Sequence, residues 1–254
     1  MKNLKDKLKK KKITIGSWIT LNDPAVAEIM AQAGFDWLAV DMEHSGLSFC
    51  DAQEIIRVIG LYEVTPLVRV MKNDSSMIKK FMDAGAHGVI VPMVNSKDDA
   101  QRAVDAVKYP PLGTRGVGLT RAQNYSLDLE SYIEWNQKDS IVIVQVEHIK
   151  AVENLEEIMS VKGVDGFIIG PYDLSGSLGC PGDFSDPKFK QALKEIYAKS
   201  KRSGYLMGQH VVEPRSELVE EKIKEGVKFI GFGTDFLFLG EHVKSCLKKI
   251  KSYL

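Results

Sequence analysis

Five polar side chains follow short apolar runs, and their types suit proton transfer and the binding of oxygen-rich ligands. Asp41 and His44 follow the run WLAV, Arg69 interrupts TPLVRV, Glu147 ends IVIVQVE and Asp173 ends GFIIGPYD. A carboxylate that hydrogen-bonds one imidazole nitrogen fixes the tautomer and leaves the other nitrogen as a base. The sequence therefore predicts an acid/base pair of Asp41 and His44, with a purely structural histidine as the alternative.

Two further carboxylates suit a divalent cation. Glu147 and Asp173 end consecutive predicted strands, so they should be neighbours at one edge of a sheet. Two carboxylates without a nearby cysteine form a hard oxygen site of the kind that Mg2+ or Mn2+ prefers. The alternative is a pair of carboxylates satisfied by arginine or by main-chain N–H groups, and the residues alone leave both open.

Arg69 would be buried at the end of its strand, which is costly unless a carboxylate or a ligand meets it. Its planar guanidinium suits a substrate carboxylate or a developing enolate oxygen, and a structural pair with Asp41 or Glu147 is the alternative. Gln145 lies two residues before Glu147, on the same face of the strand, where it could donate to a bound oxygen. If the same alternation continues to Glu43, its side chain should point away from the barrel interior, as a residue behind the site or at an interface.

A repeated unit predicts the scaffold that brings these strand ends together. Helix-like segments end at Gly34, Gly85, Gly163 and Gly226, shortly before an apolar run, as expected of a left-handed residue that closes a helix. Strands that alternate with helices form a parallel sheet. The chain has 254 residues and no GxGxxG after a strand, so a (β/α)8 TIM barrel, an α/β fold with residues 1–254 as a single domain, is favoured over an open doubly wound sheet.

We expect strands at about 13–19, 37–42, 66–70, 88–93, 141–147, 166–170, 206–211 and 229–233. We expect helices at about 23–33, 48–60, 75–84, 97–107, 150–160, 188–203, 215–225 and 236–252. Two dipeptides are expected to start helices, Asp23-Pro24 and Glu213-Pro214.

Two segments lie outside this repeat. The basic N-terminus has Leu4 and Leu8 four residues apart, which predicts an amphipathic helix that covers the lower end of the barrel. The long connection between Val107 and Ile141 is expected to be a flap or subunit contact that carries Arg115 and Arg121, with a decorative insertion as the alternative.

Composition narrows the class of protein. Thirty-four basic residues balance thirty-four acidic ones, which argues against a nucleic-acid-binding protein and leaves little charge repulsion to oppose self-association. No stretch approaches the ~18 apolar residues of a membrane span, and the N-terminus lacks the apolar core of a signal peptide. Three scattered cysteines fit reduced thiols, so we expect a cytoplasmic protein. No apolar run ends in lysine, so no Schiff-base nucleophile is evident.

The motifs and their order resemble the HpcH/HpaI aldolase family. The similarity covers about residues 13–235 and rests on GSWITLNDPAVAEIMAQAGFDWLAVDMEH, TPLVRV, DAGAHGVIVPMV, YPPLGTRGVG, VQVEHIKAVENLEEI and VDGFIIGPYDLSGSLG. Members are metal-dependent (class II) pyruvate aldolases that act on 2-keto-3-deoxy acids, including 2-dehydro-3-deoxyglucarate and 4-hydroxy-2-oxo-heptanedioate. The resemblance implies a carbon–carbon lyase that acts on a keto acid and an aldehyde, with Mg2+, Mn2+ or Co2+ as its cofactor.

The resemblance also assigns roles to the individual residues that bind the metal ion and the keto acid. It implies that Glu147 and Asp173 hold the divalent ion, which pyruvate chelates through its carboxylate and keto oxygens. Arg69 and Gln145 would contact the keto acid, and Arg69 would stabilise the enolate.

The acid/base and carboxylate-binding groups are implied in the same way. Asp41 and His44 would form the acid/base dyad, and Gly170 and Tyr172 would flank the pyruvate carboxylate through the main chain. The sequence departs from the family at Tyr172, where a small residue is common, and at Ser45-Gly46. These departures put in doubt which aldehyde the site accepts. They leave the residues that bind the metal ion and the enolate unchanged.

The resemblance implies a homo-oligomer, a hexamer, in which the YPPLGTRGVG loop and the C-terminal helix contact neighbouring subunits. Two other functions stay open. One is a carbon–carbon lyase like citrate lyase or a malyl-CoA lyase, which would need a CoA site with extra basic residues. The other is a catalytically silent barrel, against which the five intact site residues argue.

Overall fold

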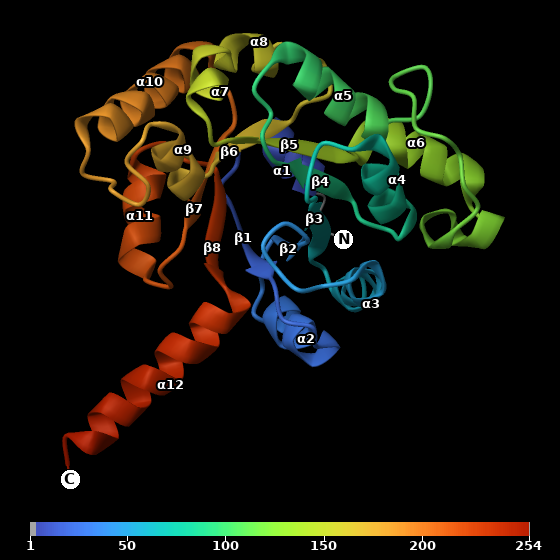
Figure 1. The fold of residues 1–254 in the computed structure, drawn as a ribbon. Helices are drawn as coiled ribbons and strands as arrows, with labels where there is room; N and C mark the ends of the chain where they lie inside the picture. The colour runs from blue at the N-terminus through green and yellow to red at the C-terminus, as the bar shows by residue number, and fades with distance from the viewer. Residues whose placement is uncertain (1–3, 254) are drawn as a thin grey trace.

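Eight strands form a closed barrel in which each strand pairs in parallel with the next and β8 pairs with β1. The computed structural model describes residues 4–253 and confirms the predicted TIM barrel (Figure 1). The strands are β1 (Thr14–Ile19), β2 (Trp37–Asp41), β3 (Thr65–Arg69), β4 (Gly88–Val91), β5 (Ile141–Val146), β6 (Gly166–Ile169), β7 (Met207–Val211) and β8 (Phe229–Thr234).

The strands are apolar because both of their faces are buried, one in the barrel and the other beneath helices. Every residue of β2, β5 and β6 is buried. Inside the barrel Trp37 stacks on Phe229 with ring centroids 4.3 Å apart, and Trp18 meets Trp37 edge-on at 6.0 Å. This aromatic layer fills the barrel below the ends of the strands, where the polar side chains begin.

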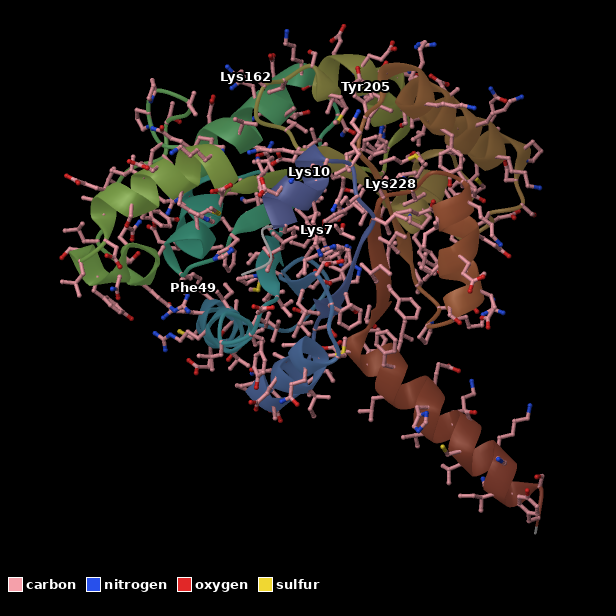
Figure 2. The ribbon with its side chains drawn as sticks, turned by 180° about the vertical axis from the view of Figure 1, so that it is seen from behind. Lys7, Lys10, Phe49, Lys162, Tyr205 and Lys228 are labelled. Carbon is pink, nitrogen blue, oxygen red and sulfur yellow. The ribbon has the colours of Figure 1, made fainter. Side chains whose placement is uncertain are left out.

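The predicted N-terminal helix is confirmed for the described residues as α1 (Leu4–Lys9). Leu4 and Leu8 are buried in the same apolar cluster as Trp18 and Trp37, so the helix closes the lower end of the barrel. Figure 2, which views the molecule from behind, shows α1 lying across the barrel. Residues 1–3 of the predicted basic segment lie outside the described residues.

The helices between the strands largely match the predicted ones. They are α2 (Pro24–Gln32), α3 (Phe49–Ile59), α4 (Ser75–Asp83), α5 (Lys97–Val107), η1 (Arg121–Ser126), α6 (Leu129–Asp139), α7 (Ile149–Glu153), α8 (Leu155–Met159), α9 (Pro171–Ser177), α10 (Pro187–Ser203), α11 (Ser216–Lys224) and α12 (Asp235–Lys251). The helix predicted at 150–160 is divided in two at Asn154, and η1, α6 and α9 were not predicted. Among the described residues, no helix is both long and apolar enough to span a membrane.

Local signals explain most helix ends. Asp23 caps α2 by accepting from the Ala25 amide, as predicted. The glycines predicted to close helices all have positive φ, between 92° and 110°. At Gly163 a Cβ would also lie 2.7 Å from the Val104 side chain. Both the backbone conformation and the lack of space therefore favour glycine at this position. The predicted start at Glu213-Pro214 is wrong, because α11 begins at Ser216 after an Arg215 that makes no side-chain cap.

The long connection is fixed to the barrel by the two arginines that were predicted to act at a flap. The buried Arg115 guanidinium lies 4.7 Å from the Tyr109 ring and pairs with Asp83 at 2.5 Å. Arg121 donates to the Ala84 carbonyl at 2.9 Å. Both arginines therefore tie the connection to the end of α4, and neither lines the cavity described below.

Candidate active site

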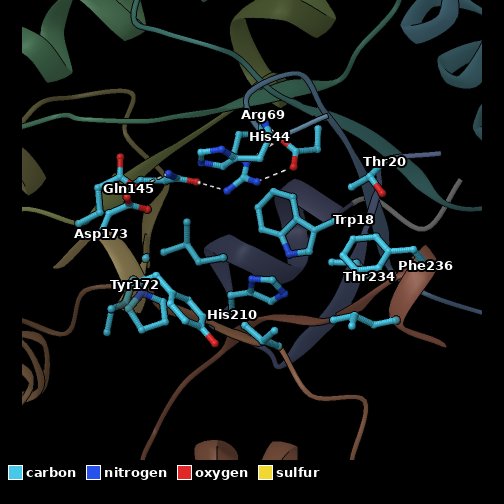
Figure 3. Close-up of a pocket in the computed structure, with 18 residues that line it drawn as sticks. Trp18, Thr20, His44, Arg69, Gln145, Tyr172, Asp173, His210, Thr234 and Phe236 are labelled. Atoms are coloured by element: carbon cyan, nitrogen blue, oxygen red, sulfur yellow. Dashed lines mark hydrogen bonds and ion pairs between the residues drawn. The ribbon is translucent and has the colours of Figure 1, made fainter. Parts of the chain in front are cut away.

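A cavity of about 370 Å³ opens at the carboxyl ends of the strands (Figure 3). The sequence-predicted residues that line it are Asp41, His44, Arg69, Gln145, Glu147, Gly170, Tyr172 and Asp173. They reach one place because each follows or ends a parallel strand of a closed barrel, where active sites of this architecture lie. All of the predicted site residues are thus brought together.

Arg69 and Asp41 form a two-point ion pair across β3 and β2. Arg69 Nη2 lies 2.5 Å from Asp41 Oδ2, and Arg69 Nε lies 2.8 Å from Asp41 Oδ1. Burial alone would raise the pKa of Asp41, but the hydrogen bonds and charge of Arg69 outweigh it, and the pKa lies below its usual value. The Arg69 guanidinium carbon also lies 4.5 Å from the centre of the Trp18 ring. This cation–π contact helps to fix the orientation of the guanidinium group.

The expected contact between the Asp41 carboxylate and the His44 imidazole is not present. Asp41 Oδ1 instead accepts from the main-chain amides of Glu43 and His44, at 3.0 and 3.2 Å. The His44 side chain is 61% exposed, and its Nε2 lies 3.8 Å from Glu43 Oε2. Asp41 therefore shapes the loop that carries His44, while the Glu43 carboxylate lies close to the ring.

Glu43 was expected behind the site or at an interface, and it does not line the cavity, although its side chain reaches Arg69. The alternation of a strand stops where β2 ends at Asp41, and the chain then turns around the Asp41 carboxylate. Glu43 Oε2 lies 3.5 Å from Arg69 Nε and is buried without a hydrogen-bond partner. Burial, and after it the charge of Glu147, raises the pKa of Glu43 to about 7.

Glu147 is held in place from two sides. Gln145 Nε2 donates to one carboxylate oxygen at 2.5 Å, and the Met93 amide donates to the other at 2.6 Å. Met93 has a φ of 52°, an uncommon conformation for a residue with a side chain. Burial raises the pKa of Glu147, and the nearby Asp173 carboxylate adds to this effect, despite the hydrogen bonds. Met93 is a contributor that the sequence could not reveal, because only its main chain takes part.

Asp173 enters the cavity from the first turn of α9, directly after β6, and its side chain is exposed. Gly170 leaves room beside Glu147, since a Cβ there would lie 2.9 Å from Glu147 Oε2. Tyr172 packs edge-on against Phe184 with ring centroids 5.0 Å apart. In Figure 3 Asp173 lies beside Gln145, across the cavity from Trp18 and Thr234.

The carboxylates of Glu147 and Asp173 are the kind of ligand that a hard divalent cation prefers. Glu147 supplies a buried carboxylate whose oxygens still have free lone pairs, and Asp173 supplies a second carboxylate at the open side. Within the described part of the chain, no cluster of three or more His, Cys, Asp or Glu side chains could hold a metal. A site with two protein carboxylates suits an ion such as Mg2+, which keeps several water or substrate oxygens in its shell.

The opposite wall contains Trp18 and Phe236, which were not predicted as site residues, and His210, which was expected to be mainly structural with a minor chance of lining the opening. Trp18 and His210 line the cavity with ring centroids 5.4 Å apart, and Phe236 lies at its edge. Burial lowers the pKa of His210 to about 4, so its ring is neutral at pH 7, and its Nε2 lies 3.2 Å from the Gly233 carbonyl oxygen. An aromatic residue in a strand is typical of a core, and only its place near the strand's carboxyl end could have indicated a site.

Comparisons with known proteins identify the family of the chain. The family model described as HpcH/HpaI aldolase/citrate lyase matches residues 14–239. A hydroxypyruvate/pyruvate aldolase of Sagittula stellata is 41% identical over 222 residues, 87% of each chain. A 2-keto-3-deoxy-L-rhamnonate aldolase of Escherichia coli is 32% identical over 98% of this chain and 92% of its own. The crystal structure of an HpcH/HpaI aldolase/citrate lyase family protein from Burkholderia cenocepacia matches with a TM-score of 0.93 and 30% identity, covering 99% of this chain and all of that one.

Proposed function

We propose that this chain, which belongs to the HpcH/HpaI aldolase/citrate lyase family, is a class II aldolase that makes or breaks a carbon–carbon bond between pyruvate enolate and an aldehyde. Its substrate would be a 2-keto-3-deoxy acid. The similar proteins named as aldolases of pyruvate, hydroxypyruvate and a keto-deoxy acid support this choice of reaction. The lyase of CoA esters stays a weaker alternative, because the cavity lining holds no lysine and only one arginine, which is already paired.

One observation carries the proposal. A continuous chain of contacts runs from Asp41 through Arg69 and Gln145 to Glu147, with Arg69 Nη1 3.5 Å from Gln145 Oε1. It places a fixed positive charge between two anchored carboxylates at the strand ends. A keto acid bound there would meet a guanidinium fork where negative charge develops during cleavage, which is the arrangement that stabilises an enolate.

Glu147 and Asp173 would hold the divalent ion, with Mg2+, Mn2+ and Co2+ as the candidates. When bound, such an ion acts as a Lewis acid that polarises the keto group of the substrate. Gln145 and the Met93 amide keep the Glu147 carboxylate oriented, and Gly170 keeps the space beside it open.

The remaining residues would bind the substrate and move its proton. Gly170 and Tyr172 would contact the carboxylate of the keto acid through their main chain. His44 would take the proton of the C4 hydroxyl, the C3–C4 bond would break, and its electron pair would pass to the pyruvate part as the enolate. Arg69 would face the oxygen that becomes negative, and the aldehyde would leave through the open side of the cavity.

A screen of 2-keto-3-deoxy acids with coupled detection of pyruvate tests the proposal. Release that requires a divalent ion, and that is abolished by EDTA and restored by Mg2+, Mn2+ or Co2+, is expected. Release that EDTA does not affect would refute the role of the ion. A barrel that binds keto acids and cleaves none of them would be the silent alternative. Borohydride with pyruvate should trap no lysine adduct, and a trapped lysine would overturn the class II mechanism.

A homo-oligomer, a hexamer, is part of the same proposal. The helix α12 extends away from the barrel (Figure 1), and one of its faces carries apolar side chains that are 47–62% exposed. These side chains are Phe236, Leu239, Val243, Leu247 and Ile250. Such a stripe favours burial against another copy of the chain. Light scattering tests the mass, and a monomer would refute this part alone. The cytoplasmic location also stays a prediction.

A further inference from the structure

A second cavity adjoins the candidate active site. Its volume is about 670 Å³, and its lining includes Met93 and His148, which do not line the cavity of about 370 Å³ described above. We call the larger one the outer cavity and the smaller one the inner cavity. Three residues line both of them, Glu147, Tyr172 and Asp173. These three residues therefore form the partition between the two cavities.

The Tyr172 side chain is the part of this partition that is not assigned to an ion. Tyr172 is 54% exposed, and its ring lies edge-on against Phe184, with ring centroids 5.0 Å apart. Phe184 in turn packs on the buried Phe189 at 5.2 Å, so two aromatic contacts connect the Tyr172 ring to the core. Within residues 4–253, no hydrogen bond holds the Tyr172 hydroxyl group. The ring is therefore held by packing alone.

The polar side of the inner cavity is assigned to the keto acid. In the proposed function, the ion at Glu147 and Asp173 and the Arg69 guanidinium hold its oxygen atoms, which leaves the rest of the cavity for the carbons beyond C3. The side chains around that space are mostly apolar or aromatic, and they include Trp18, Val212, Phe236, Leu237 and Tyr172. In Figure 3 the Tyr172 ring extends from the side of Asp173 toward His210, so it limits this space on the side of the outer cavity.

We propose that the Tyr172 side chain sets the longest aldehyde that this site accepts. The ring closes the inner cavity against the outer one, so the carbons beyond C3 of the substrate stop at the ring. A smaller side chain at this position would join the two cavities and let a longer chain continue past Asp173. Tyr172 thus determines specificity by its bulk, and its hydroxyl group is not required. This inference rests on the proposed function, because it names the size of the aldehyde that the same site uses.

Straight-chain 2-keto acids test the proposal without turnover. Pyruvate, 2-oxopentanoate, 2-oxohexanoate and 2-oxooctanoate have no hydroxyl group at C4, so they cannot be cleaved, and their carbons beyond C3 occupy the place of the aldehyde. Calorimetry of the full chain with Mg2+ gives a Kd for each acid. Dividing each Kd by the Kd of pyruvate for the same protein removes any effect on the keto-acid group that they share. In the wild type this ratio should rise toward 2-oxooctanoate, because the longer chain meets the ring.

Three variants separate the bulk of the ring from its hydroxyl group. Tyr172→Ala should lower the ratio for 2-oxooctanoate by about 10-fold or more, the gain expected when two or more methylene groups become buried. Tyr172→Phe is the matched control, because it keeps the ring and removes only the hydroxyl group, and it should keep the wild-type ratio. Phe184→Ala removes the ring that supports Tyr172, so it should lower the ratio by less than Tyr172→Ala does.

Catalysis gives a second readout. With pyruvate as the other substrate, the kcat/KM for pentanal relative to that for ethanal should increase by about 10-fold in Tyr172→Ala, within the range that a methylene group contributes to selection by an apolar pocket. Because only ratios within one protein are compared, a general loss of activity does not affect the result.

Equal ratios in the wild type and in Tyr172→Ala would overturn the proposal and leave the proposed function intact. A change of the same size in Tyr172→Phe would also overturn it, because the hydroxyl group and not the bulk of the ring would then select the substrate. If the wild type binds none of the keto acids in the presence of Mg2+, the proposed function itself is refuted, and the limit on the aldehyde falls with it.

Discussion

Replacing Arg69 by lysine separates the charge of this side chain from its shape. Lysine keeps one positive charge but has no planar fork, so it cannot form both contacts with Asp41 at 2.5 and 2.8 Å. One charge-assisted hydrogen bond to a buried carboxylate is lost, which should lower the free energy of unfolding by about 1.5–3 kcal/mol. The cation–π contact with Trp18 also weakens, because the ammonium group does not stack on the ring.

The effect on activity should be larger than the effect on stability. Loss of one donor aimed at the developing negative charge lowers kcat by about 100- to 1000-fold in comparable sites. We expect that range for Arg69→Lys in a coupled pyruvate-release assay, with urea unfolding measured on the same samples. The control is Arg57→Lys, since Arg57 is a half-exposed arginine of α3 that pairs with Glu54 outside the cavity. A folded Arg69→Lys enzyme with nearly wild-type kcat would refute the argument that the fork acts on the enolate.

Three other changes test separate parts of the site and fold. Glu147→Gln should weaken Mg2+ binding in calorimetry by about 10-fold or more while the circular dichroism spectrum is retained, because a neutral amide replaces one of the two carboxylates; unchanged binding would exclude Glu147. Gly170→Ala should weaken binding of the same ion, since its Cβ would lie 2.9 Å from Glu147 Oε2, whereas Gly176→Ala in the same helix has open space and should not; equal effects would remove the steric explanation. Burial lowers the pKa of His87 to about 4, so the unfolded state binds one more proton at this residue between pH 6.5 and 4, and His87 should lower stability by about 1.4 kcal/mol per pH unit as pH falls. His210 has a similarly lowered pKa and adds a slope of its own, so His87→Phe should remove only part of the pH dependence in urea titrations, and an unchanged slope would show that His87 does not contribute.

The barrel could be predicted because the same local signals recur at each repeat. Strand residues such as those of β5 are apolar on both faces, and a glycine with positive φ follows each of several helices, for example Gly34 before β2. The site residues could be predicted as a set, since a closed parallel barrel brings all strand ends to one opening. The helix α9 was missed because it has seven residues and follows β6 without a loop.

Contacts among the site residues could not be predicted in the same way. Side-chain alternation applies only within a strand, and β2 ends at Asp41, so it could not show that Glu43 approaches Arg69. The Asp41 carboxylate could equally have met His44 or Arg69, and the choice depends on loop geometry that appears only in three dimensions. Met93 contributes through an amide with an unusual backbone conformation, for which a methionine in the sequence gives no signal.

The charges around the cavity explain why its parts act together. Asp41 is paired with Arg69 and keeps a lowered pKa, whereas Glu43 and Glu147 have raised pKa values because burial and the neighbouring carboxylates disfavour their charges. His210 is neutral and contributes no compensating charge. The carboxylates on the Glu147 side therefore exceed the available positive charge, and a divalent cation would offset that excess where Arg69 cannot. The same cation would bring the keto acid beside Arg69, because the excess negative charge that attracts a cation would by itself repel an anionic substrate.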